Sequence, residues 1–274
     1  MAYFASLFIL LVSISLSGCS PLAAVGAIGS TVNNAAYNSA ERELNHPTQR
    51  RDEQALEVAI ANMKLGIEYM QQGAYERALY NLKRSTLAKP DFAPAYNVLG
   101  LLYQKLGDMV EAENNFKTSL KLDASDSSTF NNYGLFLCSN QRYEEAESAF
   151  MSAANNPLYR SPEIALTNAG LCALDREPDK AENYFKLALK KNPNFPYALI
   201  QLSDIAYNQN QFELAYQYIE RYKKNARHTP KSLWLGVRIC KELGYEDDAS
   251  SYALLLRNQF PDTKEAKMLA EWQL

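Results

Sequence analysis

Small residues recur along this chain at a spacing of about 34 residues. Gly66, Gly100 and Gly134 are each 34 positions apart. A series of alanines keeps nearly the same interval, with a single step of 35: Ala78, Ala112, Ala146, Ala181, Ala215 and Ala249. Small residues at a fixed interval allow pairs of helices to pack closely. Self-similarity of this period therefore predicts a stack of repeated helix pairs rather than a globular core.

A period of 34 residues is that of the tetratricopeptide repeat (TPR), a pair of antiparallel helices. In the repeat pattern a bulky residue such as Phe116 follows the alanine by four positions, on the same helix face, and fills the space beside the glycine. We predict an all-α fold: a right-handed α-solenoid of six TPR repeats over about residues 59–262. Residues 263–274 are predicted to form a C-terminal capping helix, with Asp262 or Thr263 as N-cap and Trp272 on its apolar face.

The period is broken once, between the third and fourth repeats. Two additional residues lie around positions 156–162, and this segment contains Pro157 and Pro162. Proline interrupts regular helix packing. We therefore expect the array to bend or divide here.

The N-terminus reads as a processing signal. Residues 7–16 are nearly all apolar, a run too short to span a membrane, and they lead into Leu16-Ser17-Gly18-Cys19. This order is similar to a bacterial lipobox, in which the cysteine is acylated. We predict a lipoprotein signal peptide at 1–18, a lipidated N-terminus and flexible tether at 19–55, and a TPR superhelix at 56–274. Ser20, in place of Asp, favours the outer membrane. The alternative is an ordinary signal peptide with a chance cysteine.

The composition argues against an enzyme and against nucleic-acid binding. The net charge is −3 and the chain has only two histidines, His46 and His228, both expected in solvated segments. We find no nucleophile–base pair, phosphate-binding loop or spacing of metal ligands. We therefore expect no cofactor, no metal, no small-molecule substrate and no catalytic residue.

Three cysteines remain in the predicted repeats. Cys138 and Cys172 are 34 positions apart, near the ends of equivalent helices in adjacent repeats, whereas Cys240 lies two repeats beyond Cys172. Stacked helices bring inward-pointing cysteines within reach of a disulfide, and the predicted envelope location is oxidising. We predict a Cys138–Cys172 bond and a free, buried Cys240. The alternative is three buried thiols.

The first helix of a TPR repeat lines the inner face of the stack. In the first repeat the inward positions are all apolar, and methionine adapts to varied contacts, which suits a partner peptide or helix. In the next two repeats some of these positions carry asparagine, which could hydrogen-bond an extended backbone. The alternative is that the row packs against the tether or the superhelix itself. The predicted partner-binding groove comprises Ile60, Met63, Ile67, Met70, Asn97, Leu101 and Asn131.

Several segments are more specific than the general repeat pattern. They are residues 131–138 (NNYGLFLC), 156–159 (NPLY), 168–172 (NAGLC) and 233–236 (LWLG). Together with the lipobox and six repeats, they resemble the PilF/PilW family of type IV pilus biogenesis lipoproteins over about residues 55–262. The prolines that end the second helix are missing after repeats two and five, which departs from the repeat pattern.

The resemblance implies a pilotin. Such a protein would be anchored by Cys19 to the periplasmic face of the outer membrane, would bind the secretin subunit of the type IV pilus, and would promote its localisation and multimerisation for pilus biogenesis. The alternative is a TPR adaptor lipoprotein for β-barrel assembly or for peptidoglycan hydrolases. The segments 131–138 and 168–172 argue against that alternative.

Overall fold

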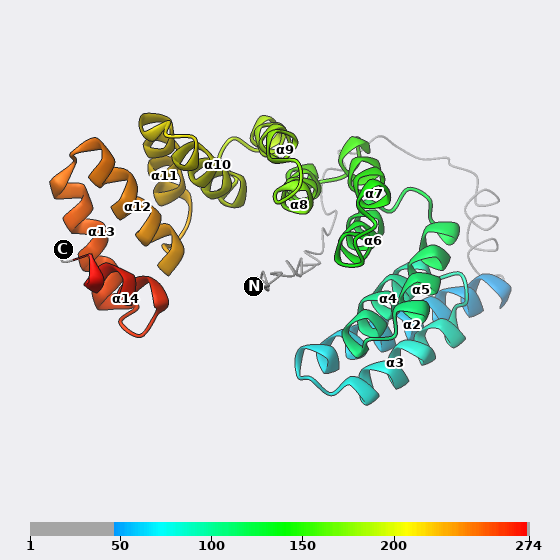
Figure 1. The fold of residues 1–274 in the computed structure, drawn as a ribbon. Coiled ribbons are helices and arrows are strands. Elements are labelled where there is room, and N and C mark those ends of the chain that lie inside the picture. The colour runs from blue at the N-terminus through cyan, green and yellow to red at the C-terminus, as the bar shows by residue number, and fades with distance from the viewer. Residues whose placement is uncertain (1–46, 273–274) are drawn as a thin grey trace, which may run out of the picture. The chain divides into compact units, whose positions relative to one another are not determined.

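The repeats appear in the structure as consecutive helix pairs (Figure 1). The computed structural model describes residues 47–272, with side chains from residue 50 onward. This part of the chain contains thirteen α-helices and no strand, and its residues 50–272 belong to one compact unit. The predicted all-α TPR solenoid is confirmed. The predicted signal peptide, the acylation at Cys19 and most of the tether lie outside the described residues.

Each of the six repeats consists of a first helix and a second helix. The pairs are α2 (Pro47–Gln71) with α3 (Tyr75–Ala88), α4 (Ala93–Leu106) with α5 (Met109–Leu122), α6 (Ser127–Ser139) with α7 (Tyr143–Asn155), α8 (Pro162–Ala173) with α9 (Pro178–Lys191), α10 (Pro196–Asn208) with α11 (Phe212–Asn225), and α12 (Pro230–Leu243) with α13 (Glu246–Gln259). The last helix, α14 (Lys264–Glu271), follows the sixth pair.

The first helix begins earlier than the sequence pattern indicates. The predicted boundary between tether and superhelix was at residue 56, but α2 starts at Pro47. Residues 50–54 (RRDEQ) are all exposed, so they lack the apolar periodicity that marks a buried helix face. Arg, Glu and Gln are nevertheless good helix formers. The start of α2 is thus a solvated extension of a helix that becomes buried only at Ala59.

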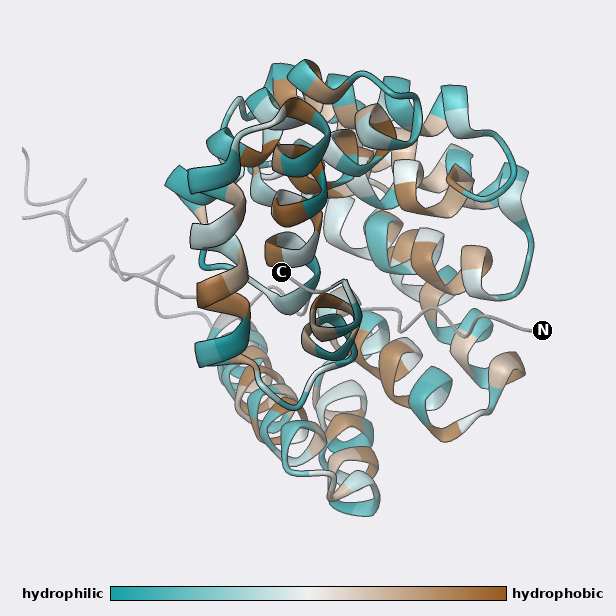
Figure 2. Ribbon diagram, turned by 60° about the vertical axis from the view of Figure 1, so that its left-hand side comes forward, coloured by the Kyte–Doolittle hydropathy of each residue, from teal (hydrophilic) through white to brown (hydrophobic). Residues whose placement is uncertain are grey.

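Glycines in the first helices make room for large side chains from the second helices. A Cβ atom on Gly100 would lie 2.8 Å from the ring of Phe116, and one on Gly134 would lie 2.6 Å from the ring of Phe150. Both rings are fully buried. The same contact is made by Gly66 with Leu82, Gly170 with Phe185 and Gly236 with Tyr252. Apolar and polar stretches alternate along the helices, as expected when each presents one face to this core (Figure 2).

The fifth and sixth repeats reach the same packing by other means. Ser203 replaces the glycine of the fifth repeat, and its buried hydroxyl donates a hydrogen bond of 2.9 Å to the backbone oxygen of Ala215. In the sixth repeat the ring beside Gly236 comes from Tyr252, and not from Ala253, which stands four positions after the repeat's alanine, Ala249. The ring beside the glycine thus comes from three positions after the alanine in this repeat, instead of four.

The connections between repeats are uniform with one exception. Four residues join consecutive repeats at 89–92, 123–126, 192–195 and 226–229, and four more lead to the last helix at 260–263. Six residues, 156–161, join α7 to α8. The Nδ2 of Asn156 donates to the Ser125 backbone oxygen at 2.8 Å and to the Ser127 hydroxyl at 2.9 Å. The longer connection is thus held against the preceding one.

The last helix caps the array as predicted. The Thr263 hydroxyl accepts the backbone N–H of Ala266, which makes Thr263 the N-cap of α14. Ala266 and Leu269 are buried against α12 and α13. Trp272, 47% exposed, packs edge-on against Trp234 with ring centroids 4.9 Å apart. The cap therefore covers the apolar face that a seventh repeat would otherwise occupy.

Candidate functional site

The predicted groove of the first repeat lies along α2. Ile60, Met63, Ile67 and Met70 are all half-buried. Met63 and Met70 also pack against the buried cluster of Ala78, Leu82, Leu99 and Leu102. The two methionines are therefore partly covered by their own repeat and the next one. Ile60 and Ile67 do not pack against that cluster. These side chains form an apolar surface of flexible and branched residues that is still partly accessible.

The asparagines of the second and third repeats make hydrogen bonds between repeats. Asn97 and Asn131 are buried. The Nδ2 of Asn132 donates to the Oδ1 of Asn97 at 3.1 Å, and the Nδ2 of Asn168 donates to the Oδ1 of Asn131 at 2.9 Å. A position in an open groove, as predicted, is therefore only part of the role of these two residues. The Oδ1 atom of each side chain is already used in the packing of one repeat on the next. Half-buried Leu101 packs against the central core between them.

Cys138 and Cys172 lie together at the ends of α6 and α8. Their sulfur atoms are 2.09 Å apart and form a disulfide, with Cα atoms 6.0 Å apart. The bond joins the third repeat to the fourth, at the end of α8 that lies away from the irregular connection. Cys240 is a free thiol buried in α12. Burial raises the pKa of the Cys240 thiol to about 12, and the carboxylates of Asp248 and Glu220 act in the same direction. This thiol is therefore protonated and inert at neutral pH.

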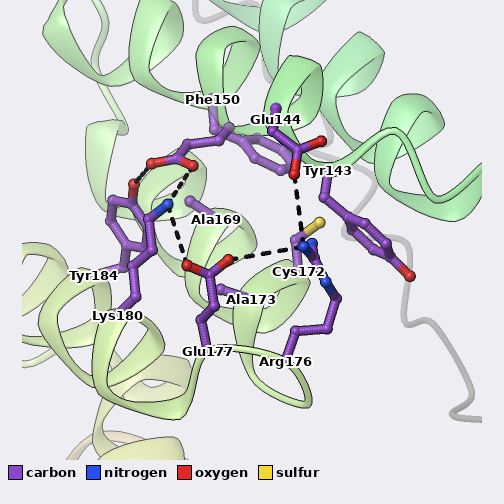
Figure 3. Close-up of a pocket in the computed structure, with 11 residues that line it drawn as sticks. Tyr143, Glu144, Phe150, Ala169, Cys172, Ala173, Arg176, Glu177, Lys180 and Tyr184 are labelled. Carbon is purple, nitrogen blue, oxygen red and sulfur yellow. Dashed lines mark hydrogen bonds and ion pairs between the residues drawn. The ribbon is translucent and has the colours of Figure 1, made fainter.

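A charged cavity of 230 Å³ lies beside this disulfide (Figure 3). It is enclosed by the first half of α7, the end of α8 and the start of α9. Lys180 and Arg176 lie on either side of Glu177 in this view, with Lys180 3.7 Å and Arg176 4.0 Å from its carboxylate. Lys180 also binds Glu147 at 2.5 Å, and the Arg176 guanidinium lies 3.9 Å from the ring centroid of Tyr143. The two cations of this cavity are therefore already matched by acidic and aromatic side chains.

The partly buried carboxylate of Glu147 connects the third repeat to the fourth. Glu147 accepts hydrogen bonds from Lys180 and Tyr184. Burial acts to raise the pKa of Glu147, but these two hydrogen bonds outweigh it, and the pKa lies below its usual value. Because both donors belong to the following repeat, the ionised carboxylate ties the two repeats together.

Glu113 makes the equivalent connection between the second repeat and the third. It binds Arg142 at 2.8 Å, Lys117 at 2.7 Å and the Tyr133 hydroxyl at 3.1 Å. Burial again acts to raise the pKa of Glu113, but the hydrogen bonds from these three side chains lower it to about 2. Sequence reasoning missed this network and the partners Asn132 and Asn168. A signal was present, because Glu113 and Glu147 are themselves 34 positions apart.

Within residues 47–272 no helix combines the length and apolarity needed to cross a membrane. Over the same residues, no three His, Cys, Asp or Glu side chains gather where they could hold a metal ion.

Comparison with known families identifies the repeats. Three models described as TPR or tetratricopeptide repeats match residues 66–107, 93–126 and 165–230. The matches cover both sides of the irregular connection. They agree with the helix pairs of the structure.

Individual relatives resemble the chain over most of its length. The type IV pilus assembly protein PilF of Pseudomonas aeruginosa is 30% identical over 210 residues, which cover 76% of this chain and 83% of PilF. A solved structure of Pseudomonas aeruginosa PilF matches with a TM-score of 0.69, covering 81% of this chain and 98% of that one. The crystal structure of PilW, described as a widely conserved type IV pilus biogenesis factor, matches with a TM-score of 0.66 at 29% identity, covering 78% and 98%.

Proposed function

Because the chain belongs to the PilF/PilW family of type IV pilus TPR proteins, we propose that it acts as a pilotin. It binds the secretin subunit of the type IV pilus and promotes the localisation and multimerisation of that subunit in the outer membrane. The observation that carries the proposal is the 30% identity to PilF over 210 residues, which cover 76% of this chain and 83% of PilF.

The proposed contact surface is the apolar row of the first repeat. Ile60, Met63, Ile67 and Met70 project from one face of α2 and are partly accessible. An apolar row of this spacing suits an amphipathic helix or an extended segment with large side chains. Methionine side chains adapt to such partners at low cost.

The proposed membrane attachment is the acyl group on Cys19. Acyl chains contribute about 0.8 kcal/mol per buried methylene, so a multiply acylated cysteine holds a protein at the membrane without a spanning helix. Labelling cells with radioactive palmitate should mark the protein, and Cys19→Ala should lose the label and move the protein to the soluble fraction. Retention of the label by that variant would overturn the attachment at Cys19.

The binding surface is best tested at Ile67. Ile67→Glu places a charge in the row without altering the two methionines that pack on the core. The matched control is Leu171→Glu, which changes the residue after the glycine in the fourth repeat, as Ile67 follows Gly66 in the first. Leu171 is 42% exposed, so the control also tolerates a charge. Thermal unfolding of both variants confirms that each remains folded.

The readout is the recovery of outer-membrane proteins from the same organism on the immobilised full chain, identified by mass spectrometry. We expect the secretin to bind the parent and the Leu171→Glu variant but not the Ile67→Glu variant. Binding of the secretin by all three would remove the groove from the proposal. Recovery of barrel-assembly or cell-wall proteins without the secretin would reject the pilotin role and favour the envelope-adaptor alternative.

A further inference from the structure

A second cavity lies at the opposite end of the helices that enclose the charged one. Its volume is 360 Å³, and its walls come from the end of α7, the first half of α8 and the end of α9. The charged cavity uses the other ends of the same three helices. Pockets for small ligands and side chains measure about 300–1,000 Å³, so the second cavity has room for a few atoms of an anchoring side chain and its neighbours.

The cavity adjoins the irregular connection between the third and fourth repeats. Residues 156–161 are two residues longer than the other connections between repeats. Asn156 fixes this segment to Ser125 of the preceding connection and to Ser127 at the start of α6. The connection is thus held by contacts toward the third repeat, and none of residues 156–161 lines the cavity.

The walls of the cavity are mainly apolar, and exposed Asn155 is the one uncharged polar residue among them. Leu166 is only 3% exposed and forms part of the central core, and Met151 is half-buried beside it. Leu187 stands 37% exposed on α9, one of the exposed large apolar side chains of the described residues. An apolar side chain placed among these three residues would be removed from water on several sides.

The mouth of the cavity is positively charged. Lys190 and Lys191 line it and are exposed, and no acidic side chain is among the lining residues. Within residues 50–272 neither lysine forms an ion pair or a side-chain hydrogen bond, whereas Lys180 and Lys186 on the same helix are both paired with glutamates. The charged cavity balances its cations internally, but this one leaves two cations for a ligand.

We propose that this cavity is a second binding site, for a short acidic segment of a partner polypeptide that carries a large apolar side chain. The apolar side chain enters between Met151, Leu166 and Leu187. Carboxylates flanking it pair with Lys190 and Lys191. The site lies in the third and fourth repeats, apart from the groove of the first, and the proposal does not depend on the identity of the partner bound there.

Cations in the last turn of a helix also have a purely local explanation. They interact favourably with the carbonyl end of the helix dipole. Helix α11 offers a matched case, because Lys223 and Lys224 occupy its last turn and line neither cavity. The dipole accounts for a lysine pair in both helices, but only the pair of α9 stands at the mouth of an apolar cavity.

The test uses the full chain in lipid nanodiscs and a phage pool displaying random hexapeptides. The binding variant is Lys190→Glu with Lys191→Glu, and the control is Lys223→Glu with Lys224→Glu. Each double variant changes the net charge by −4. Each also reverses the charge in the last turn of the second helix of one repeat, α9 in the binding variant and α11 in the control. Lys223 pairs with Glu220 and contacts the ring of Tyr252, so thermal unfolding is recorded for both proteins before selection.

We expect selection on the parent and on the control to enrich peptides with a large apolar residue next to at least one Asp or Glu. The binding variant should not enrich them. For a synthetic peptide of the enriched sequence, fluorescence anisotropy should give an affinity at least tenfold weaker for the binding variant and also for Leu187→Asp. The proposal is overturned if no enrichment depends on Lys190 and Lys191, if the enriched peptides lack acidic residues, or if Leu187→Asp binds them as the parent does.

Discussion

The first repeat and the middle of the array place different chemistry at equivalent positions. Three residues before the glycine, the first repeat carries Met63, whereas the second and third carry Asn97 and Asn131. The half-buried methionine packs on a cluster of four buried residues, and the asparagines accept hydrogen bonds from the next repeat. Among residues 51–272 no ion pair joins the first repeat to the second, but ion pairs and a disulfide join the later ones. One scaffold thus combines an adaptable end with a cross-linked middle.

The first repeat and the middle repeats should differ most when the large residue packed against the glycine of a repeat is truncated to alanine. Phe150→Ala removes a fully buried ring and should lower the free energy of unfolding by about 3–5 kcal/mol. Leu82→Ala makes the equivalent change in the first repeat and should cost about 2–5 kcal/mol. Leu82 packs with Leu99 and Leu102 of the second repeat. Since repeats interact mainly with their neighbours, the second variant should loosen the first two repeats and leave the later ones protected. Hydrogen exchange checks this. If both variants lost amide protection equally in residues 127–191, the first repeat and the middle of the array would not differ as proposed.

Removing the disulfide should have the next largest effect. Cys138→Ala with Cys172→Ala should lower the free energy of unfolding by about 2–4 kcal/mol, because the unfolded chain is no longer constrained by the bond. Urea unfolding of the parent should show the same loss after reduction with dithiothreitol. The double variant should not respond to the reductant. If it does respond, the sensitivity of the parent to the reductant does not come from the Cys138–Cys172 bond.

The asparagine pair between the third and fourth repeats should contribute less. Asn168→Ala leaves the buried Oδ1 of Asn131 without its donor and should cost about 1–2 kcal/mol. A double-mutant cycle with Asn131→Ala measures the coupling between the two side chains by urea unfolding. A coupling energy near zero would mean that these asparagines do not hold the repeats together.

The smallest effect should be the pH dependence contributed by Glu113. Its pKa is lowered to about 2 in the folded chain from 4.5. The ionised form therefore stabilises the fold above pH 4.5, and this contribution is lost as the pH falls from 4.5 toward 2. After allowance for solvent screening it amounts to about 1 kcal/mol. The difference in urea midpoint between the parent and Glu113→Gln should shrink over this range. A constant difference would show that the ion pairs of Glu113 do not stabilise the middle repeats.

The sequence predicts the parts of this fold that depend on spacing within one repeat. A glycine and a large side chain must meet wherever two helices cross, so the 34-residue period locates helix pairs, turns and the cap. The start of α2 could not be located in this way, because residues 50–54 are exposed and show no apolar period. The pairing of Asn131 with Asn168 also escapes simple periodicity. The residues differ by 37 positions, since the extra length of the 156–161 connection shifts the register between the two repeats.

The disulfide also changes how the chain carries mechanical load. Cys138 and Cys172 are 34 positions apart, so a force applied through the two ends of the chain passes through the sulfur atoms and bypasses the residues between them. At about 3.3–3.6 Å per extended residue, the bond withholds about 115 Å of contour length from stretching. Helix α7, the irregular connection and α8 lie almost wholly within the bypassed segment. Under tension the repeats at either end can unravel without stretching this segment, so the chain contains a middle that bears no tensile load.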